Sequence, residues 1–323
     1  MMAMRMADQG DIARNSDPGC DLVTGAFSYS GAAIASRLLA SGRRVRTLTS
    51  HPERARRLSQ VVEAHPYRFD DPRALARSLE GVHTLYNTYW VRFERAGTTF
   101  AGAVTNSRAL FEAARQAGVA RVVHVSVSNA SPDSPLPYFR GKALVEQALD
   151  EVGLPHAIVR PTWIFGGAGE LLANNIGWIL RRFPVFPLPG DGRYEVQPVH
   201  IDDYARICQQ AAQVEGNVTL DAAGPETLTF EALILAIRAA VGSRSGIVHV
   251  PPGLMRAASR ALGLVVRDVV LTAEEIRGLM AGLLVSAQPP LGTIGFSDWI
   301  AGHGSAFGDR YVNELRNHFA QST

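Results

Sequence analysis

The chain contains almost no lysine and almost no cysteine. A single lysine stands among 32 basic residues in 323, and the only cysteines are Cys20 and Cys208. Two cysteines far apart in apolar company make neither a disulfide framework nor a metal site, so we expect no bound metal. Their scarcity also suits a reducing compartment, which predicts a cytoplasmic protein.

Long apolar runs are missing as well. Residues 261–270 are interrupted by Arg267 and Asp268, and residues 279–285 are too few to cross a bilayer. The first residues are polar and mixed in charge, without the apolar segment of a signal peptide. We therefore expect a disordered leader over residues 1–18 and no membrane insertion.

The charge balance excludes two further classes of protein. The net charge is +2, and no basic stripe is interleaved with aromatic residues, so no nucleic-acid partner is expected. With 46% hydrophobic and 19% charged residues, the composition is that of a folded globular protein and not of a disordered chain.

The first half of the chain alternates β-rich runs with amphipathic stretches, which predicts a parallel sheet. The expected strands cover residues 21–24, 44–49, 82–87, 121–127 and 157–160, and the later chain is mainly helical. The fold class is α/β: a Rossmann-type doubly wound parallel sheet with a smaller, mainly helical C-terminal cap. We expect a dinucleotide-binding domain over 19–165, completed by 195–222, and a substrate or cap region over 166–194 and 223–323.

The first predicted strand runs into the segment TGAFSYSG, residues 24–31. Glycines at this position allow a tight turn and let backbone amides approach a pyrophosphate at the start of the next helix. Ser28 stands where glycine is frequent, and its hydroxyl could donate to a phosphate oxygen. An ordinary turn is the alternative. The predicted cofactor contacts in this segment are Thr24, Gly25, Phe27, Ser28, Tyr29, Ser30 and Gly31.

The end of the second predicted strand bears on the choice of dinucleotide. NAD sites usually carry an acid there, whereas this chain reads Thr49-Ser50-His51 with no acid before Glu53. Ser50 and Arg54 would accept a 2′-phosphate. We therefore predict NADP(H) in preference to NAD(H).

The lone lysine, Lys142, lies four residues after Tyr138. Positions four apart share a helix face, so phenol and ammonium can act on one small volume. A nearby cation would lower the pKa of the phenol and make it an acid or base near neutral pH. Ser126 and Ser128 follow the predicted central strand and could position a substrate oxygen. A lysine placed on the surface by chance is the alternative.

Taken together, these motifs resemble the extended or atypical short-chain dehydrogenases/reductases, in the NAD(P)-dependent epimerase/dehydratase and NmrA-like group. The resemblance also rests on RPTWIFG at 160–166 and QPVHIDD at 197–203. It implies that Tyr138 is the acid/base, that Lys142 holds the nicotinamide ribose, and that a serine binds the reacting oxygen. Ser128 is the better match for that serine and Ser126 the second.

Further site residues are expected on the same basis. Predicted cofactor contacts are Asp70, Asn87, Thr88, Pro161 and Thr162. Predicted substrate contacts are Tyr89, Trp163, Phe165, Asn174, Tyr194 and His200. The stretch NTYW at 87–90 has larger side chains than members of the family often have there. These side chains would either narrow the nicotinamide pocket or line the substrate pocket with aromatic rings.

These expectations lead to an NAD(P)-dependent oxidoreductase or epimerase that transfers a hydride at a carbonyl or alcohol centre. The predicted partner is a small, hydrophobic substrate, and an oligomer is compatible with the sequence. Two alternatives stand: a non-catalytic NADP(H)-binding sensor or assembly protein, and a nucleotide-sugar epimerase that would use Arg181, Arg182 and Arg193 for a diphosphate.

Overall fold

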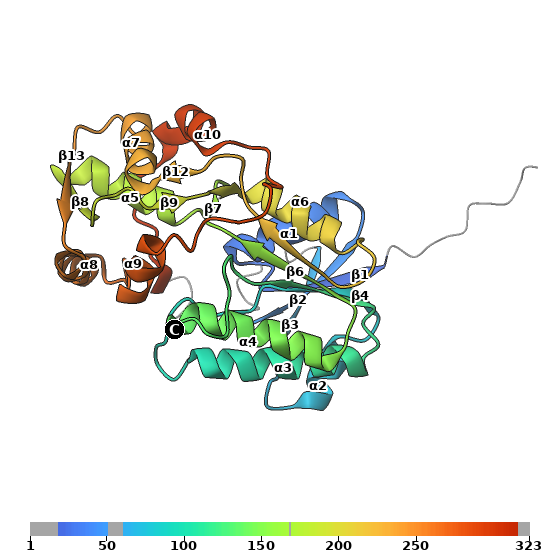
Figure 1. Ribbon diagram of the computed structural model, residues 1–323. Helices are drawn as coiled ribbons and strands as arrows, with labels where there is room; N and C mark the ends of the chain where they lie inside the picture. The colour runs from blue at the N-terminus through green and yellow to red at the C-terminus, as the bar shows by residue number, and fades with distance from the viewer. Residues whose placement is uncertain (1–18, 51–60, 168, 316–323) are drawn as a thin grey trace, which may run out of the picture.

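The computed structural model describes residues 19–50, 61–167 and 169–315 (Figure 1). Its main feature is a seven-stranded sheet in the order β11-β6-β5-β4-β1-β2-β3, with every neighbouring pair parallel. The strands are β1 (Cys20–Thr24), β2 (Arg44–Thr49), β3 (Val62–Pro66), β4 (Val82–Asn87), β5 (Arg121–Val125), β6 (His156–Pro161) and β11 (Val218–Ala222). The predicted Rossmann-type doubly wound sheet is confirmed.

Helices cover both faces of this sheet. Figure 1 shows α1 (Tyr29–Ala40) and α6 (Ile201–Ala211) on one face, and α2 (Pro72–Ser78), α3 (Phe100–Gln116) and α4 (Pro137–Val152) on the other. Central strands such as β1 and β5 are buried along their whole length. Each face therefore has its own apolar core, one against Ile34 and Tyr204 and the other against Leu110 and Val145.

The remaining elements gather beside the carboxyl edge of the sheet, and we call this group the cap. It contains β7 (Ile164–Phe165), α5 (Leu172–Arg182), β8 (Val185–Pro189), β9 (Glu195–Val196), β10 (Val199–His200), β12 (Leu228–Thr229), α7 (Phe230–Ala240), β13 (Gly246–Val250), α8 (Pro252–Val266), α9 (Ala273–Met280), α10 (Phe296–His303) and the 3₁₀ helix η2 (Gly304–Ala306). A third apolar core, with Phe165, Leu233 and Phe296 at its centre, holds the cap together.

Residues 195–222 were expected to complete the sheet domain, and only the end of this range joins the sheet. Residues 218–222 pair with β6 as the edge strand β11. Residues 196–200 do not join it: Val196 pairs with β12, and β10 pairs with β7. The β-branched residues of 196–200 favour a strand, but the backbone of this segment pairs with the short cap strands β7 and β12.

Within the described part of the chain, no helix has both the length and the apolar character needed to cross a membrane. The predicted leader, residues 1–18, lies outside the described residues.

Candidate functional site

A cavity of about 670 Å³ lies between the carboxyl edge of the sheet and the cap. Its sheet side is formed by residues after β5 and on α4, among them Ser126, Tyr138 and Lys142. Its cap side is largely apolar, with Trp163, Phe186 and many aliphatic side chains. This is the edge at which open α/β sheets bind ligands.

The turn between β1 and α1 has the form that a pyrophosphate needs. Gly25 has a φ of +65°, which favours glycine. A Cβ on Gly31 would lie 2.2 Å from the carbonyl oxygen of Gly25, so only glycine fits there. The first turn of α1 carries no acid, and its N-cap residue Ser28 makes no side-chain capping bond. The amides at this helix start are thus left for an anion.

Ser28 does not supply the phosphate donor that the sequence suggested. Its hydroxyl donates to the Gly25 carbonyl oxygen at 2.6 Å, so the donor is used inside the turn. Tyr29 and Ser30 line the cavity, and the Tyr29 hydroxyl donates to the Gly166 carbonyl at 2.7 Å. Phe27 packs against the apolar core beneath α1. The turn therefore offers its backbone, not the Ser28 side chain, to a cofactor.

The ends of β1 and β4 are tied together beside this turn. The Thr88 amide donates to Thr24 Oγ1 at 2.7 Å, and the Thr88 hydroxyl donates to the Thr24 carbonyl at 2.5 Å. Asn87 is fully buried, with Nδ2 3.2 Å from His124 Nδ1 and Oδ1 accepting from the Tyr89 amide at 3.1 Å. Thr88 lines the cavity, while Thr24 and Asn87 hold the edge of the sheet.

The structure describes only one of the two residues predicted to choose between NADP(H) and NAD(H). Ser50 is exposed at the end of β2, and Arg54 lies outside the described residues. Asp70 is exposed and not part of the cavity lining. The preference for NADP(H) stays a prediction.

Lys142 is 3% exposed on α4, which excludes the alternative of a surface lysine. Its Nζ donates to the Val125 carbonyl at 2.9 Å and lies 4.9 Å from the centre of the Trp90 ring. Burial lowers the pKa of Lys142 to about 7, although Glu146 acts in the opposite direction. The ammonium has three donors, of which one is used here, so it has donors left for a ligand in the cavity.

Tyr138 differs from its expected state. Burial, and next the nearby Glu275, raise the pKa of the phenol above its ordinary value, where a lowering was expected from Lys142. The ring of Trp90 contacts both Tyr138, with centroids 6.0 Å apart, and the Lys142 ammonium, and so adds to the burial of both groups. A Cβ on Gly141 would lie 2.8 Å from the indole, so this glycine makes room for the ring against α4 between the two residues.

The two serines after β5 have different surroundings. Ser126 lines the cavity, and its buried hydroxyl has no hydrogen-bond partner among the described residues. Ser128 donates to the Leu283 carbonyl at 2.7 Å and is not part of the lining. Ser128, the better match by resemblance, thus fastens the cap to the sheet, whereas Ser126, the second match, lines the cavity.

Of the predicted cofactor contacts at the end of β6, both Pro161 and Thr162 line the cavity. The Thr162 hydroxyl donates to the Gln197 carbonyl at 2.5 Å, which leaves its lone pairs available. Of the predicted substrate contacts, Trp163 lines the cavity and is 5% exposed.

Five other predicted substrate residues lie elsewhere, because packing uses them. They are Tyr89, Phe165, Asn174, Tyr194 and His200. Phe165 and His200 pack together inside the cap, and His200 Nδ1 accepts from the Asp202 amide as the N-cap of α6. Tyr194 stacks on Phe230. Tyr89 packs against the rings of Tyr67 and Phe69. Asn174 donates to the Arg310 carbonyl at 3.0 Å.

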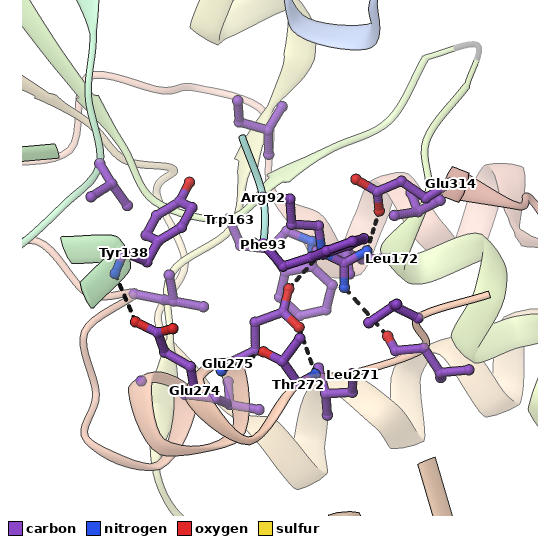
Figure 2. Close-up of a pocket in the computed structure, with 18 of the residues that line it drawn as sticks. Arg92, Phe93, Tyr138, Trp163, Leu172, Leu271, Thr272, Glu274, Glu275 and Glu314 are labelled. Atoms are coloured by element: carbon purple, nitrogen blue, oxygen red, sulfur yellow. Dashed lines mark hydrogen bonds and ion pairs between the residues drawn. The ribbon is translucent and has the colours of Figure 1, made fainter. Parts of the chain in front are cut away.

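A charged group in the lining was missed by sequence reasoning. Arg92, after β4, pairs with Glu275 of α9 at 2.5 Å and with Glu314 near the end of the chain (Figure 2). Burial alone would lower the pKa of Arg92, but the two carboxylates raise it above its ordinary value. The partners lie 183 and 222 residues away in the sequence, so no local pattern could have shown them.

Carboxylates outnumber cations in this lining. The acidic lining residues are Glu94, Glu170, Asp268, Glu274, Glu275 and Glu314, against Arg92 and Lys142. Glu274 accepts from the Tyr138 amide at 2.7 Å, as Figure 2 shows. Burial raises the pKa of Glu170 to about 7, although its oxygens accept from amides at the start of α5. Among the described residues, no acidic, histidine or cysteine cluster is arranged to hold a metal.

Residues 25–172 match a protein family described as NAD(P)H-binding. These residues thus form an NAD(P)H-binding domain, and the chain shares its fold with solved reductases. The resemblance drawn from the phosphate turn and the tyrosine–lysine pair is thus confirmed. The glycines of the turn and the uncapped start of α1 fit the pyrophosphate of a nicotinamide dinucleotide.

Three proteins illustrate the likeness. NADH dehydrogenase (ubiquinone) 1 alpha subcomplex subunit 9 of Arabidopsis thaliana mitochondria is 26% identical over 69% of this chain and 58% of its own length. Photosystem II assembly factor Ycf39 of Cyanidium caldarium is 25% identical over 75% and 78%. Triphenylmethane reductase of Citrobacter sp., solved with NADP(H), shares the fold with a TM-score of 0.73 at 16% identity, over 88% of this chain and 99% of that chain.

The match thus spans little more than half of the Arabidopsis thaliana relative.

Proposed function

We propose that the protein is an NAD(P)(H)-dependent oxidoreductase, with NADPH preferred, that reduces a carbonyl group of a small apolar molecule. The observation that carries this proposal is the buried hydroxyl of Ser126, which faces the same cavity as Tyr138 and Lys142 without a protein partner. Buried polar groups usually have partners, and a partner missing in a cavity marks a place for a ligand oxygen.

Tyr138 would be the proton donor in the direction of reduction. Because burial raises the pKa of its phenol, the group stays protonated at neutral pH and can act as an acid. Bound NAD(P)H would supply the hydride to the carbonyl carbon. The π electron pair of the carbonyl then moves to oxygen, which takes the proton of Tyr138, while the Ser126 hydroxyl donates a hydrogen bond to that oxygen.

Lys142 has a holding role in this scheme. With one donor on the Val125 carbonyl, its remaining donors face the cavity and would hold the ribose next to the nicotinamide. Without a ligand, the pKa of Lys142 is about 7. An anionic cofactor nearby would raise this pKa and so favour the ammonium at neutral pH.

The lining limits the class of substrate. Apolar walls favour an apolar body, and the excess of carboxylates disfavours an anionic one. A nucleotide-sugar substrate would bring a diphosphate to this cavity. Arg181 and Arg182 instead donate to backbone carbonyls between residues 305 and 309, and neither they nor Arg193 line the cavity. These contacts weigh against the nucleotide-sugar epimerase.

The test is NADPH oxidation with a panel of uncharged aldehydes, ketones and quinones. Tyr138→Phe should lower kcat on the order of 100-fold or more while leaving the Kd for NADPH unchanged. Ser126→Ala should also lower kcat, and Ser128→Ala serves as its matched control because that hydroxyl faces Leu283. Turnover by Tyr138→Phe at the wild-type rate would contradict the proposed role.

A second candidate is a non-catalytic NADP(H)-binding subunit or assembly protein. The position of Trp90 favours it, because the indole contacts both the phenol and the ammonium that would have to cooperate on a substrate. The names of two relatives, a complex subunit and an assembly factor, point the same way. NADPH binding without turnover on the whole panel, in both wild type and Trp90→Ala, would decide for this candidate.

A further inference from the structure

Helix α8 carries an apolar face that no described part of the chain covers. Leu254, Leu264 and Val265 are 57%, 83% and 76% exposed, the highest values among the large exposed hydrophobic residues apart from Val61. With the exposed Ala257 and Ala261 they recur at i, i+3, i+7, i+10 and i+11, which places them on one side of the helix. An apolar stripe of this kind on a protein surface marks an interaction site.

The charges that α8 and its C-cap residue carry are all positive. Arg256 and Arg260 are exposed, lie four residues apart and so share a face, and Arg267 follows the last turn. The helix contains no acid. The first acid after it, Asp268, is 8% exposed and accepts from the amides of residues 269, 314 and 315. The outer side of α8 therefore presents leucine and valine next to arginine, with no acid on the helix itself.

The inner side of the same helix borders the cavity. Met255 is a lining residue, and Ser259 is 5% exposed toward the protein. In Figure 1, α8 lies at the outer end of the cap next to α9, away from α1 and the phosphate turn. A molecule held at the outer face of α8 would thus be one helix diameter from the cavity, on the cap side.

We infer that α8 is an interfacial helix that binds the surface of an anionic lipid bilayer, with its apolar stripe at the level of the acyl chains. Leucine and valine on one side and arginine beside them, without acids, are the features of helices that lie in the plane of a membrane. The arginines select lipid headgroups of negative charge. A second copy of the chain is a poorer occupant, because a symmetric contact through this face would bring the same arginines together.

This inference goes beyond the proposed reduction and does not depend on it. It gives an apolar substrate a source, since the bilayer that holds α8 would also hold the substrate. Vesicle binding is measured without cofactor and without turnover. A protein that does not bind vesicles would therefore contradict the inference about α8 without bearing on the proposed reduction, and the reverse also holds.

The experiment is flotation of the full chain with phosphatidylcholine vesicles that contain or lack phosphatidylglycerol. We expect wild type to float with the phosphatidylglycerol vesicles, to stay behind with phosphatidylcholine alone, and to be released by high salt. Arg256→Glu/Arg260→Glu should lower the partition coefficient roughly 30-fold or more. Leu264→Gln/Val265→Gln should lower it as well, because the apolar stripe is lost.

The matched control is Arg73→Glu/Arg77→Glu, a pair of exposed arginines with the same spacing on α2. Figure 1 places α2 on the other side of the molecule from α8, so this variant should float as wild type does. Equal flotation of the α8 and α2 variants, or no flotation of wild type, overturns the inference. Self-association without lipid that Leu264→Gln abolishes assigns the face to a second copy and overturns it too.

Discussion

The titration of Lys142 gives the sharpest test of the site, because the chain contains no other lysine. Labelling with ¹³C-lysine yields one side-chain signal, whose shift against pH reports this group alone. We expect a midpoint at about pH 7, compared with the ordinary value of 10.5. This difference corresponds to about 5 kcal/mol by which burial disfavours the ammonium.

The same number predicts a pH dependence of stability. The folded state loses the proton at about pH 7 and the unfolded state at about 10.5, so the unfolded state binds more protons between these values. The free energy of unfolding therefore rises with pH across this window. Relative to Lys142→Met, which does not titrate, wild type should gain about 2 kcal/mol between pH 7 and pH 9 in urea unfolding.

Trp90 provides the perturbation that checks the cause. Trp90→Ala opens the ammonium to water, so the midpoint should move upward toward 10.5. Trp178→Ala is the matched control, because that ring lies 4.8 Å from the guanidinium carbon of Arg182 and not against Lys142. A midpoint above pH 10 in wild type, or one that Trp90→Ala leaves in place, would refute the reasoning.

Three other substitutions test the rest of the site. Gly31→Ala places a Cβ 2.2 Å from a backbone carbonyl oxygen and should lower NADPH affinity at least tenfold in a fluorescence titration, whereas Gly302→Ala, with open space around it, should not. Arg92→Met leaves two partly buried carboxylates without their cation and should destabilise the fold by roughly 2 kcal/mol in urea unfolding. Ser128→Ala should cost about 1 kcal/mol of stability with turnover intact, while Ser126→Ala should reduce turnover with little effect on stability; the reverse pattern would restore Ser128 as the site residue.

Much of the sheet and the phosphate turn could be predicted because their signals are local. The residues of β1 and β5 form short apolar runs that read as buried strands, and both are buried along their length. Gly25 and Gly31 are six residues apart, and their requirement for glycine follows from the turn itself. The short strands of the cap escaped this reasoning. Residues 196–200 have strand character, but their partners are chosen by the packing of the cap.

For the candidate site, too, the sequence predicted one part and missed another: it predicted the positions of two side chains but not their protonation. The tyrosine–lysine spacing placed both side chains at one cavity, yet their protonation depends on the neighbours that folding supplies. Trp90 reaches α4 from the loop after β4, and Glu275 reaches Tyr138 from the cap. Neither contact has a sequence pattern, so the expected lowering of the phenol pKa was wrong.

The sequence by itself determined that a dinucleotide turn, a serine-bearing strand end, a tyrosine and one lysine would meet at one edge of a parallel sheet, because strand and helix periodicities bring them there. Only the tertiary structure decided that Ser126 and not Ser128 faces the cavity, that Lys142 is buried beneath an indole, and that α8 turns apolar residues outward. The physical reason is that hydrogen-bond partners, burial and charge at each of these groups come from residues distant in the chain, as the bond from Ser128 to the carbonyl 155 residues later shows.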